Sequence, residues 1–153
     1  FYMAKDLITE DFLLIEGDIV IAPYALDQFE SGKNQMAVSA YEPFMDGTVV
    51  AMDKDLNVER IYLKSDFNSS LKLDKLFKTV NIYSLKHTDF CNLIVPELKK
   101  IIDSGKVNAY YEQAFTFLAN NGKMKFVGID YSDLKWFEID NEIDLKMAEE
   151  IFK

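Results

Sequence analysis

The sequence has few residues that could support disulfide, zinc or histidine chemistry. Its 153 residues include one cysteine, Cys91, and one histidine, His87. One cysteine cannot form an intramolecular disulfide, and the sequence has no spacing typical of a zinc site. Nothing near His87 in the sequence suggests a Ser/His or Cys/His pair, so we expect His87 at the surface or at a helix start, and Cys91 in the core. The single cysteine favours a reducing compartment, and we expect a cytoplasmic location.

Long hydrophobic runs and an excess of basic residues are also missing. No apolar run approaches the roughly 18 residues of a membrane span, and the start, FYMAKDLITEDF, lacks the pattern of a signal peptide. The chain has 17 basic and 26 acidic residues, which gives a formal net charge of −9. This balance argues against nucleic acid as a partner, because phosphate binding needs a basic face. It fits a cationic small substrate or a divalent metal.

Glycine is scarce too, and the six glycines form neither a G-x-G-x-x-G motif nor a P-loop. Hydrophobic periodicity instead predicts strands that alternate with helices, which indicates an α/β sheet flanked by helices. The expected strands are 12–16, 19–22, 35–40, 48–52, 59–63, 78–84, 124–129 and 136–139. The expected helices are 1–9, 24–31, 88–103, 109–119 and a last one that carries Ile143, Met147, Ile151 and Phe152.

The run FLLIE, residues 12–16, is apolar on both faces and is expected at the centre of a mixed, mostly parallel sheet. A parallel sheet of this kind normally opens with a βαβ unit, which builds a nucleotide site. Here a bare helix leads directly into a buried strand. We therefore expect a sheet that lacks its first βαβ unit.

Carboxylates follow two of the expected strands. Glu16-Gly17-Asp18 ends the first strand, where an aspartate can hold Mg²⁺, although Gly-Asp is also a common turn pair. In the segment WFEID, Glu138 and Asp140 lie two residues apart and share one face of a strand. Two carboxylates on one face repel each other unless a cation lies between them. The alternative is that Asp140 or Asn141 caps the last helix, and Asn141 can do this alone.

Aromatic residues beside acids mark two further segments. Tyr110-Tyr111-Glu112 begins a helix, where aromatic faces and a carboxylate can attract a quaternary ammonium. The plainer interpretation, that one tyrosine is in the core and the other at the surface, is favoured on this motif alone. The loop YEPFMDGT, residues 41–48, contains Asp46 and a tight turn, and its aromatic residues line a pocket or pack the loop down. Trp136 is expected to anchor the core.

Several of these segments occur together in one family. EGDIVI, YEPFMDGTVVAMD, KTVNIYS, NAYYEQAF and KWFEIDNEIDLKMAEEIF, in this order, resemble the nucleotidyltransferases of the phosphocholine and 2-aminoethylphosphonate cytidylyltransferase type. The resemblance spans residues 1–153 and is most specific in W-x-E-I-D-x-x-x-D-L-x-x-A and M-D-G-T-V-V. It implies a Rossmann-like nucleotidyltransferase fold, of which the chain forms the C-terminal two-thirds.

The resemblance also implies an activity and residue roles. The family uses Mg²⁺ to join CTP to a phosphorylated or phosphonate acceptor, and pyrophosphate is released. The carried-over metal ligands are Asp18, Glu138 and Asp140, of which Asp18 and Asp140 are also the catalytic residues. Recognition of a cationic head group is placed at Asp46, Tyr110, Tyr111 and Glu112.

Two alternatives stay open. One is a sugar-1-phosphate nucleotidylyltransferase, and the other is a non-catalytic binding domain of the same fold. Family members open with an L-A-A-G-x-G-x-R loop and a later Pro-Lys, neither of which is present here, so we expect this chain alone not to turn over CTP. The family also occurs fused to other enzymes, and a further domain downstream is an expectation.

Overall fold

The structure is a computed structural model that describes all 153 residues. The strands are β1 (Phe12–Ile15), β2 (Ile19–Ile21), β3 (Gln35–Ala40), β4 (Val49–Met52), β5 (Val58–Tyr62), β6 (Phe77–Leu85), β7 (Val127–Asp130) and β8 (Trp136–Glu138). The α-helices are α1 (His87–Asp89), α2 (Val95–Asp103), α3 (Glu112–Asn120) and α4 (Glu142–Ile151). Short 3₁₀ helices cover Tyr2–Leu7, Pro23–Gln28, Lys64–Asp66 and Leu73–Lys75, and a π-helix covers Phe90–Ile94.

The main sheet is mixed, as expected, with the order β5-β4-β6-β3-β7 and with β1 also paired to β6. The expectation that it is mostly parallel is wrong for this chain, because only β3 and β7 pair in parallel. A parallel connection needs a long crossover, usually a helix. Between β3 and its antiparallel partner β6 the chain forms only the β4–β5 hairpin and 3₁₀ turns. Helices α1, α2 and α3 then follow β6 before the chain enters β7, the parallel partner of β3.

Strand β1 is not central within this chain, contrary to expectation. It pairs only with β6, from Phe12↔Leu85 to Ile15↔Ile82, and its other edge has no partner strand. Leu13 is 39% exposed and Ile15 is 40% exposed. An apolar strand sequence shows that both faces suit burial, but it does not say how many strands pair with its two edges.

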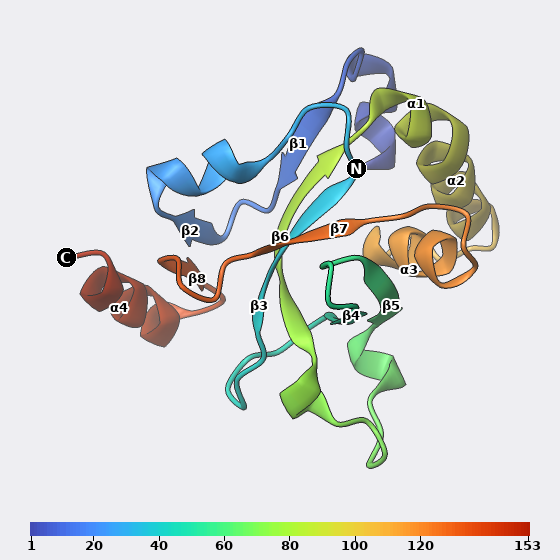
Figure 1. Cartoon of the computed structure of the whole chain (residues 1–153). Helices are drawn as coiled ribbons and strands as arrows, with labels where there is room; N and C mark the ends of the chain where they lie inside the picture. The colour runs from blue at the N-terminus through green and yellow to red at the C-terminus, as the bar shows by residue number, and fades with distance from the viewer.

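Helices cover the sheet on two sides. In Figure 1, α1, α2 and α3 lie together on one side, whereas α4 lies on the other, beside β8. The larger core, with Met36, Tyr83 and Phe115, fills the space between the sheet and α2–α3. A smaller core, with Ala25, Val80 and Tyr131, lies on the opposite face, and Trp136 packs against it as expected.

The helical segment 88–103 contains a π-turn that the sequence did not predict. Pro96 lies in the first turn of α2, where its missing N–H is not needed, and the π-helix precedes it. His87 begins α1, as expected. Cys91 is exposed rather than in the core, and its Sγ lies 3.3 Å from His87 Nε2, so the expectation of no Cys/His contact is also wrong. The two residues are four apart, which puts them on the same helical face.

None of the helices combines the length and the apolar composition that a membrane span requires.

Candidate functional site

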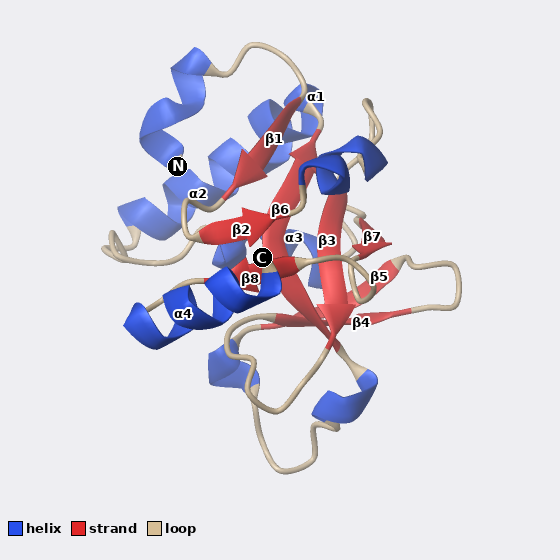
Figure 2. Cartoon of the chain, turned by 90° about the vertical axis from the view of Figure 1, so that its left-hand side faces the viewer, coloured by secondary structure: helices blue, strands red, loops and turns tan.

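The candidate site lies at a gap along one edge of β6. Strands β1 and β4 both pair with this strand, β1 at Ile82–Leu85 and β4 at Phe77–Lys78. Figure 2 shows β1 at the upper end of β6 and β4 at the lower end. The residues between the two pairings, around Asn81, therefore face the end of β1 and the beginning of β4. This arrangement brings the Glu16-Gly17-Asp18 segment close to the Asp46-Gly47-Thr48 segment.

A bulge in β6 places Asn81 at this gap. Met36 pairs with Tyr83 and Val38 with Thr79, so three residues of β6 lie opposite one residue of β3. Asn81 has a φ of 59°, in the left-handed region that asparagine tolerates better than most residues. Its Nδ2 donates to Glu16 Oε2 and to Glu138 Oε1, both at 3.0 Å. The strained residue thus links the carboxylate after β1 to the carboxylate of β8.

Lys78 is a buried cation at the same gap. Its side chain is 2% exposed, and its Nζ donates to Thr79 O at 2.7 Å and lies 3.2 Å from Glu138 Oε2. Burial is the main cause that raises the pKa of Glu138, with the charges of Asp140 and Asp18 adding to it, while Lys78 acts in the opposite direction. Both oxygens of Glu138 are therefore engaged within the chain, one by Asn81 and one by Lys78.

Gly47 packs directly against Lys78. A Cβ at this position would lie 3.3 Å from Lys78 Nζ, and the φ of Gly47 is +99°. Both features favour glycine. Beside it, Asp46 forms an ion pair with the exposed Lys64, and the hydrogen bond from Lys64 lowers the pKa of Asp46.

Partly buried carboxylates, held by tyrosine hydroxyls, line another wall of the gap. Tyr111 Oη donates to Glu16 Oε1 at 2.6 Å, and Tyr83 Oη lies 3.4 Å from Glu112 Oε1. Burial raises the pKa of Glu112, and the charge of Glu16 adds to this effect. Burial also raises the pKa of Tyr111 and of Tyr83 far above the ordinary value, so both hydroxyls stay protonated as donors.

Asp18 and Asp140 flank the two-stranded sheet of β2 and β8. Ile139 N donates to Asp18 O at 2.9 Å, so Asp140 follows directly after the residue paired with Asp18. The carboxylate of neither aspartate accepts a hydrogen bond or joins an ion pair within the chain, in contrast to that of Glu138. No group of three or more Asp, Glu, His or Cys side chains lies close enough to hold a metal ion. That Asp18, Glu138 and Asp140 together bind a metal ion stays a prediction.

Asn141 caps the last helix, so Asp140 is not needed there. Its side chain accepts hydrogen bonds from Ile143 N at 2.8 Å and from Asp144 N at 3.2 Å. Asp144 in turn accepts a hydrogen bond from Asp140 N at 3.0 Å. The cap thus fixes the backbone of Asp140 while its carboxylate remains available.

Most of these groups line one cavity of about 570 Å³. Among its lining residues are six of the seven residues predicted for the site, namely Asp18, Asp46, Tyr110, Glu112, Glu138 and Asp140. Tyr111, the seventh, reaches the site through its hydrogen bond to Glu16. Tyr110 is 75% exposed and Tyr111 packs in the larger core, which confirms the interpretation of one surface and one core tyrosine.

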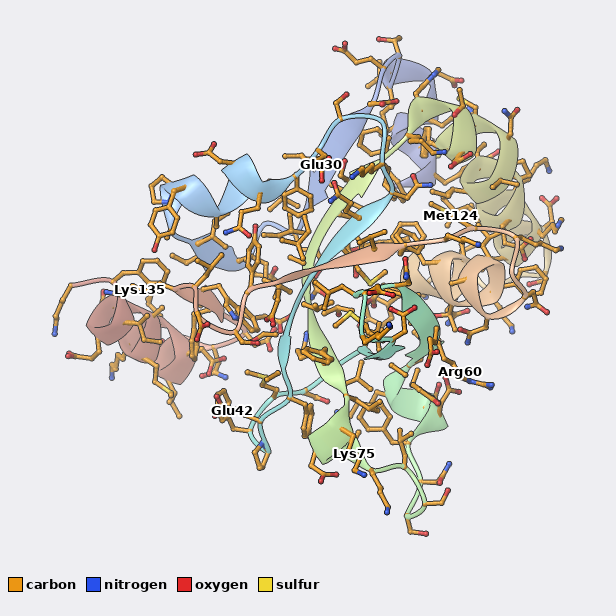
Figure 3. All side chains as sticks on the ribbon, viewed as in Figure 1. Glu30, Glu42, Arg60, Lys75, Met124 and Lys135 are labelled. Atoms are coloured by element: carbon orange, nitrogen blue, oxygen red, sulfur yellow. The ribbon has the colours of Figure 1, made fainter.

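A second cavity of about 460 Å³ lies on the other side of Lys78 and shares Asp46, Lys78, Glu138 and Asp140 with the first. Glu42 and Lys135, both labelled in Figure 3, line this second cavity from the loop after β3 and from the segment that leads into β8.

Sequence reasoning missed Lys78 and Asn81 as site residues. Both belong to KTVNIYS, which was interpreted only as a strand and as part of the family resemblance. A lysine and an asparagine inside an otherwise apolar strand were the available signal, because buried strands rarely carry such residues without a partner.

The comparisons with known proteins agree with this architecture. No protein-family profile matches the chain. The chain is 28% identical over 151 residues to the CMP-5'-(3-aminopropyl)phosphonate synthase of Streptomyces rubellomurinus, a match that covers 96% of the chain and 24% of that protein.

Two solved structures show the same fold. The CTP:phosphocholine cytidylyltransferase of Streptococcus pneumoniae matches with a TM-score of 0.76 at 17% identity, over 99% of this chain and 61% of that one. The inositol-1-phosphate CTP transferase of T. maritima matches with a TM-score of 0.63 at 19% identity, over 100% of this chain and 60% of that one. The chain thus spans about a quarter of the curated relative and about three-fifths of the structures. It has the Rossmann-like nucleotidyltransferase fold, and the resemblance to cytidylyltransferases predicted from its motifs is confirmed.

Proposed function

We propose that the chain forms the acceptor and metal side of a Mg²⁺-dependent cytidylyltransferase. The enzyme joins CTP to a phosphocholine-like or aminoalkylphosphonate acceptor and releases pyrophosphate. The observation that carries the proposal is a single cavity in which the partly buried acids Glu16 and Glu112 lie on one wall and the unpaired acids Asp18 and Asp140 lie on another. One wall suits an ammonium group, and the other suits a divalent ion.

Asp18 and Asp140 fit a magnesium site. Mg²⁺ is typically held in phosphate-transfer sites by one or two carboxylates, and substrate phosphates complete its shell. These two carboxylates have no partner within the chain, whereas Glu138 is held by Lys78 and Asn81. When bound, Mg²⁺ supplies charge neutralisation for the triphosphate and for the pyrophosphate leaving group.

The chemistry asks little of the protein in proton transfer. An oxygen of the acceptor's phosphate or phosphonate attacks the α-phosphorus of CTP, the bond to the β-phosphate breaks, and pyrophosphate leaves with the electron pair. The attacking oxygen is already ionised at neutral pH, so no general base is needed. The main task is to hold the acceptor in line with the leaving group. This agrees with a cavity that is rich in charged groups and has no histidine in its lining.

The wall formed by Glu16 and Glu112 orients the acceptor through its amino end. Partial burial and the charge of Glu16 raise the pKa of Glu112, so the two ionised carboxylates are unfavourable without a counter-ion. An ammonium between them removes this cost. Tyr111 and Tyr83 hold the two carboxylates in place through their hydroxyl groups.

A sugar-1-phosphate or polyol phosphate acceptor is the second candidate, since similar structures include an inositol-1-phosphate CTP transferase. Such an acceptor calls for neutral donors and acceptors for its hydroxyl groups. The cavity is lined by four neutral polar side chains, Thr48, Ser65, Asn81 and Gln113, against six carboxylates and two lysines, and this excess of acids favours the cationic acceptor. A non-catalytic domain would have no use for the unpaired Asp18 and Asp140.

The relative from Streptomyces extends far beyond the part that matches this chain. The relative from Streptomyces is about four times as long as its matched part, and we propose that further sequence supplies the nucleotide loop and a fused enzyme domain. The 153 residues alone should therefore bind acceptor without turning over CTP.

A thermal-shift panel on the 153-residue chain tests the acceptor class. We expect 2-aminoethylphosphonate or phosphocholine to raise the melting temperature more than inositol-1-phosphate or glucose-1-phosphate at equal concentration, because only the first pair carries a cation. The reverse order would indicate that the site binds a sugar phosphate or polyol phosphate acceptor instead. No shift with any of the four ligands would contradict an acceptor site in this cavity.

A further inference from the structure

Lys78 is the most deeply buried charged residue in the lining of the cavity, and the proposed function gives it no role in binding. Its side chain is 2% exposed on β6, in a strand position that an apolar residue could fill. Burying an ammonium group is costly unless its donors are satisfied. The two acceptors within the chain are Thr79 O and Glu138 Oε2. An ammonium group carries three N–H donors, so one remains for a ligand.

The charges around the cavity explain why this donor matters. Six carboxylates line the cavity, from Glu16, Asp18, Asp46, Glu112, Glu138 and Asp140, against the ammonium groups of Lys64 and Lys78. A phosphate or phosphonate dianion would be repelled by such a wall. The side chain of Lys64 is 69% exposed and its ammonium is paired with Asp46, so water competes for it. Lys78 is the one cation held in a fixed position at the centre.

The position of Lys78 also suits a group that lies between the two ends of an acceptor. It is the last residue of β6 that pairs with β4 and it precedes the bulge at Asn81, so it lies between the Asp46–Thr48 turn and β8. Its charge acts on Glu112 on one side and on Glu138 on the other. Lys78 lines both cavities, and a side chain in place of Gly47 would crowd its ammonium.

We propose that Lys78 binds the acceptor's phosphate or phosphonate by donating its third N–H to a non-attacking oxygen. This proposal rests on the proposed function and adds that different residues bind the two ends of the acceptor. Glu16 and Glu112 bind the ammonium, and Lys78 binds the phosphonate. Lys78 is thus a substrate-binding residue whose second task is to keep the buried Glu138 in place.

A cycle of ligands and variants tests this division. The ligands are 3-aminopropylphosphonate, propylamine and propylphosphonate, titrated into the 153-residue chain with binding followed by NMR. For the wild-type chain, adding the phosphonate to propylamine should tighten binding about 10- to 100-fold, the range of a charge-assisted hydrogen bond. In Lys78→Met this gain should fall to about threefold or less, because the carboxylates that remain in the cavity repel the phosphonate.

Two further variants separate binding from folding. Lys135→Met removes the same charge from an exposed lysine that lines only the second cavity, and it should keep the full phosphonate gain. Lys78→Met leaves Glu138 without its counter-ion, so the double variant Lys78→Met/Glu138→Gln is measured as well. It is neutral at both positions and should fold as the wild type does, yet it should also lack the gain. Lys78→Arg should keep part of it.

The outcomes distinguish this inference from the proposed function. An undiminished phosphonate gain in the double variant would show that Lys78 is only a counter-ion of Glu138, while the acceptor site stands. Failure of the wild-type chain to prefer 3-aminopropylphosphonate over both propylamine and propylphosphonate would overturn the acceptor site and, with it, the role of Lys78. If Lys135→Met lost the phosphonate gain as fully as Lys78→Met, the gain would depend only on the net charge of the chain, and the inference would be overturned.

Discussion

Replacement of Glu112 by glutamine should weaken ammonium binding while making the unliganded chain more stable. Glu112 opens α3, and its carboxylate lies 3.4 Å from Tyr83 Oη, across from Glu16. Glutamine has nearly the same shape and can keep a hydrogen bond to Tyr83. The change therefore removes a charge and little else.

The expected loss follows from the surroundings of this carboxylate. An ammonium at about 4 Å from a carboxylate gains up to about 4 kcal/mol at an effective dielectric constant of ~20. Desolvation of the ligand offsets part of this, and measured hydrogen bonds to charged groups contribute about 1.5–3 kcal/mol. We expect propylamine and 3-aminopropylphosphonate to bind about 10- to 100-fold more weakly to Glu112→Gln. Propylphosphonate, which has no ammonium, should bind at least as well as to the wild type.

Stability should change in the opposite direction. Burial and the charge of Glu16 raise the pKa of Glu112 in the folded chain. A raised carboxyl pKa means that the contribution to stability is present below the unfolded value and is lost as pH rises through the folded value. At neutral pH the ionised side chain therefore costs stability, and Glu112→Gln removes that cost. The melting temperature should rise, by about 2–4 °C for each kcal/mol in a chain of this size.

The same pKa predicts how amine binding depends on pH. Propylamine stays cationic throughout the acidic range, whereas Glu112 becomes protonated as pH falls. Affinity for propylamine should therefore begin to decline at a higher pH than an ordinary glutamate would give, and this decline should be weaker in Glu112→Gln. NMR titration at several pH values and calorimetric melting measure the two effects. Unchanged propylamine affinity in a folded Glu112→Gln would refute the role of this wall, as would a variant that loses both stability and binding of all three ligands.

Three other outcomes follow from the geometry. Millimolar Mg²⁺ should raise the melting temperature by mass action, and Asp18→Asn should remove most of the rise; an equal response in both proteins would contradict the metal site. Asn141→Ala should cost about 1 kcal/mol through loss of the helix cap, whereas Asn141→Asp keeps it, and a neutral Asn141→Ala in urea unfolding would argue against the cap. Phe115→Ala should cost about 3–5 kcal/mol, since this side chain is 1% exposed among core aromatic rings, against under about 1 kcal/mol for the partly exposed Phe117→Ala. Similar losses for the two phenylalanines would contradict the packing.

Much of the local structure could be predicted from the sequence because it depends on short-range pattern. The hairpin of β4 and β5, the long strand β6 and the last helix with its Asn141 cap follow from alternation, helical spacing and cap chemistry. The seven residues predicted for the site came from short motifs at strand ends, in a loop and at a helix start, and their roles came from the family resemblance. Six of them line one cavity, and the seventh bonds to it.

Pairing and charge compensation, in contrast, were decided only by the tertiary structure. FLLIE had the composition of a central strand, but β1 has a single neighbour, because strand order depends on contacts between distant segments. Glu138 was interpreted as a metal ligand, and its oxygens are held by Lys78 and Asn81 across the gap in β6. A sequence shows which charges exist, but only the fold shows which of them meet, since Coulomb energies depend on distance and burial. Asp18 and Asp140 were recognisable from their motifs, and it was the pairing of β2 with β8 that brought both to one cavity, where neither carboxylate has a partner within the chain.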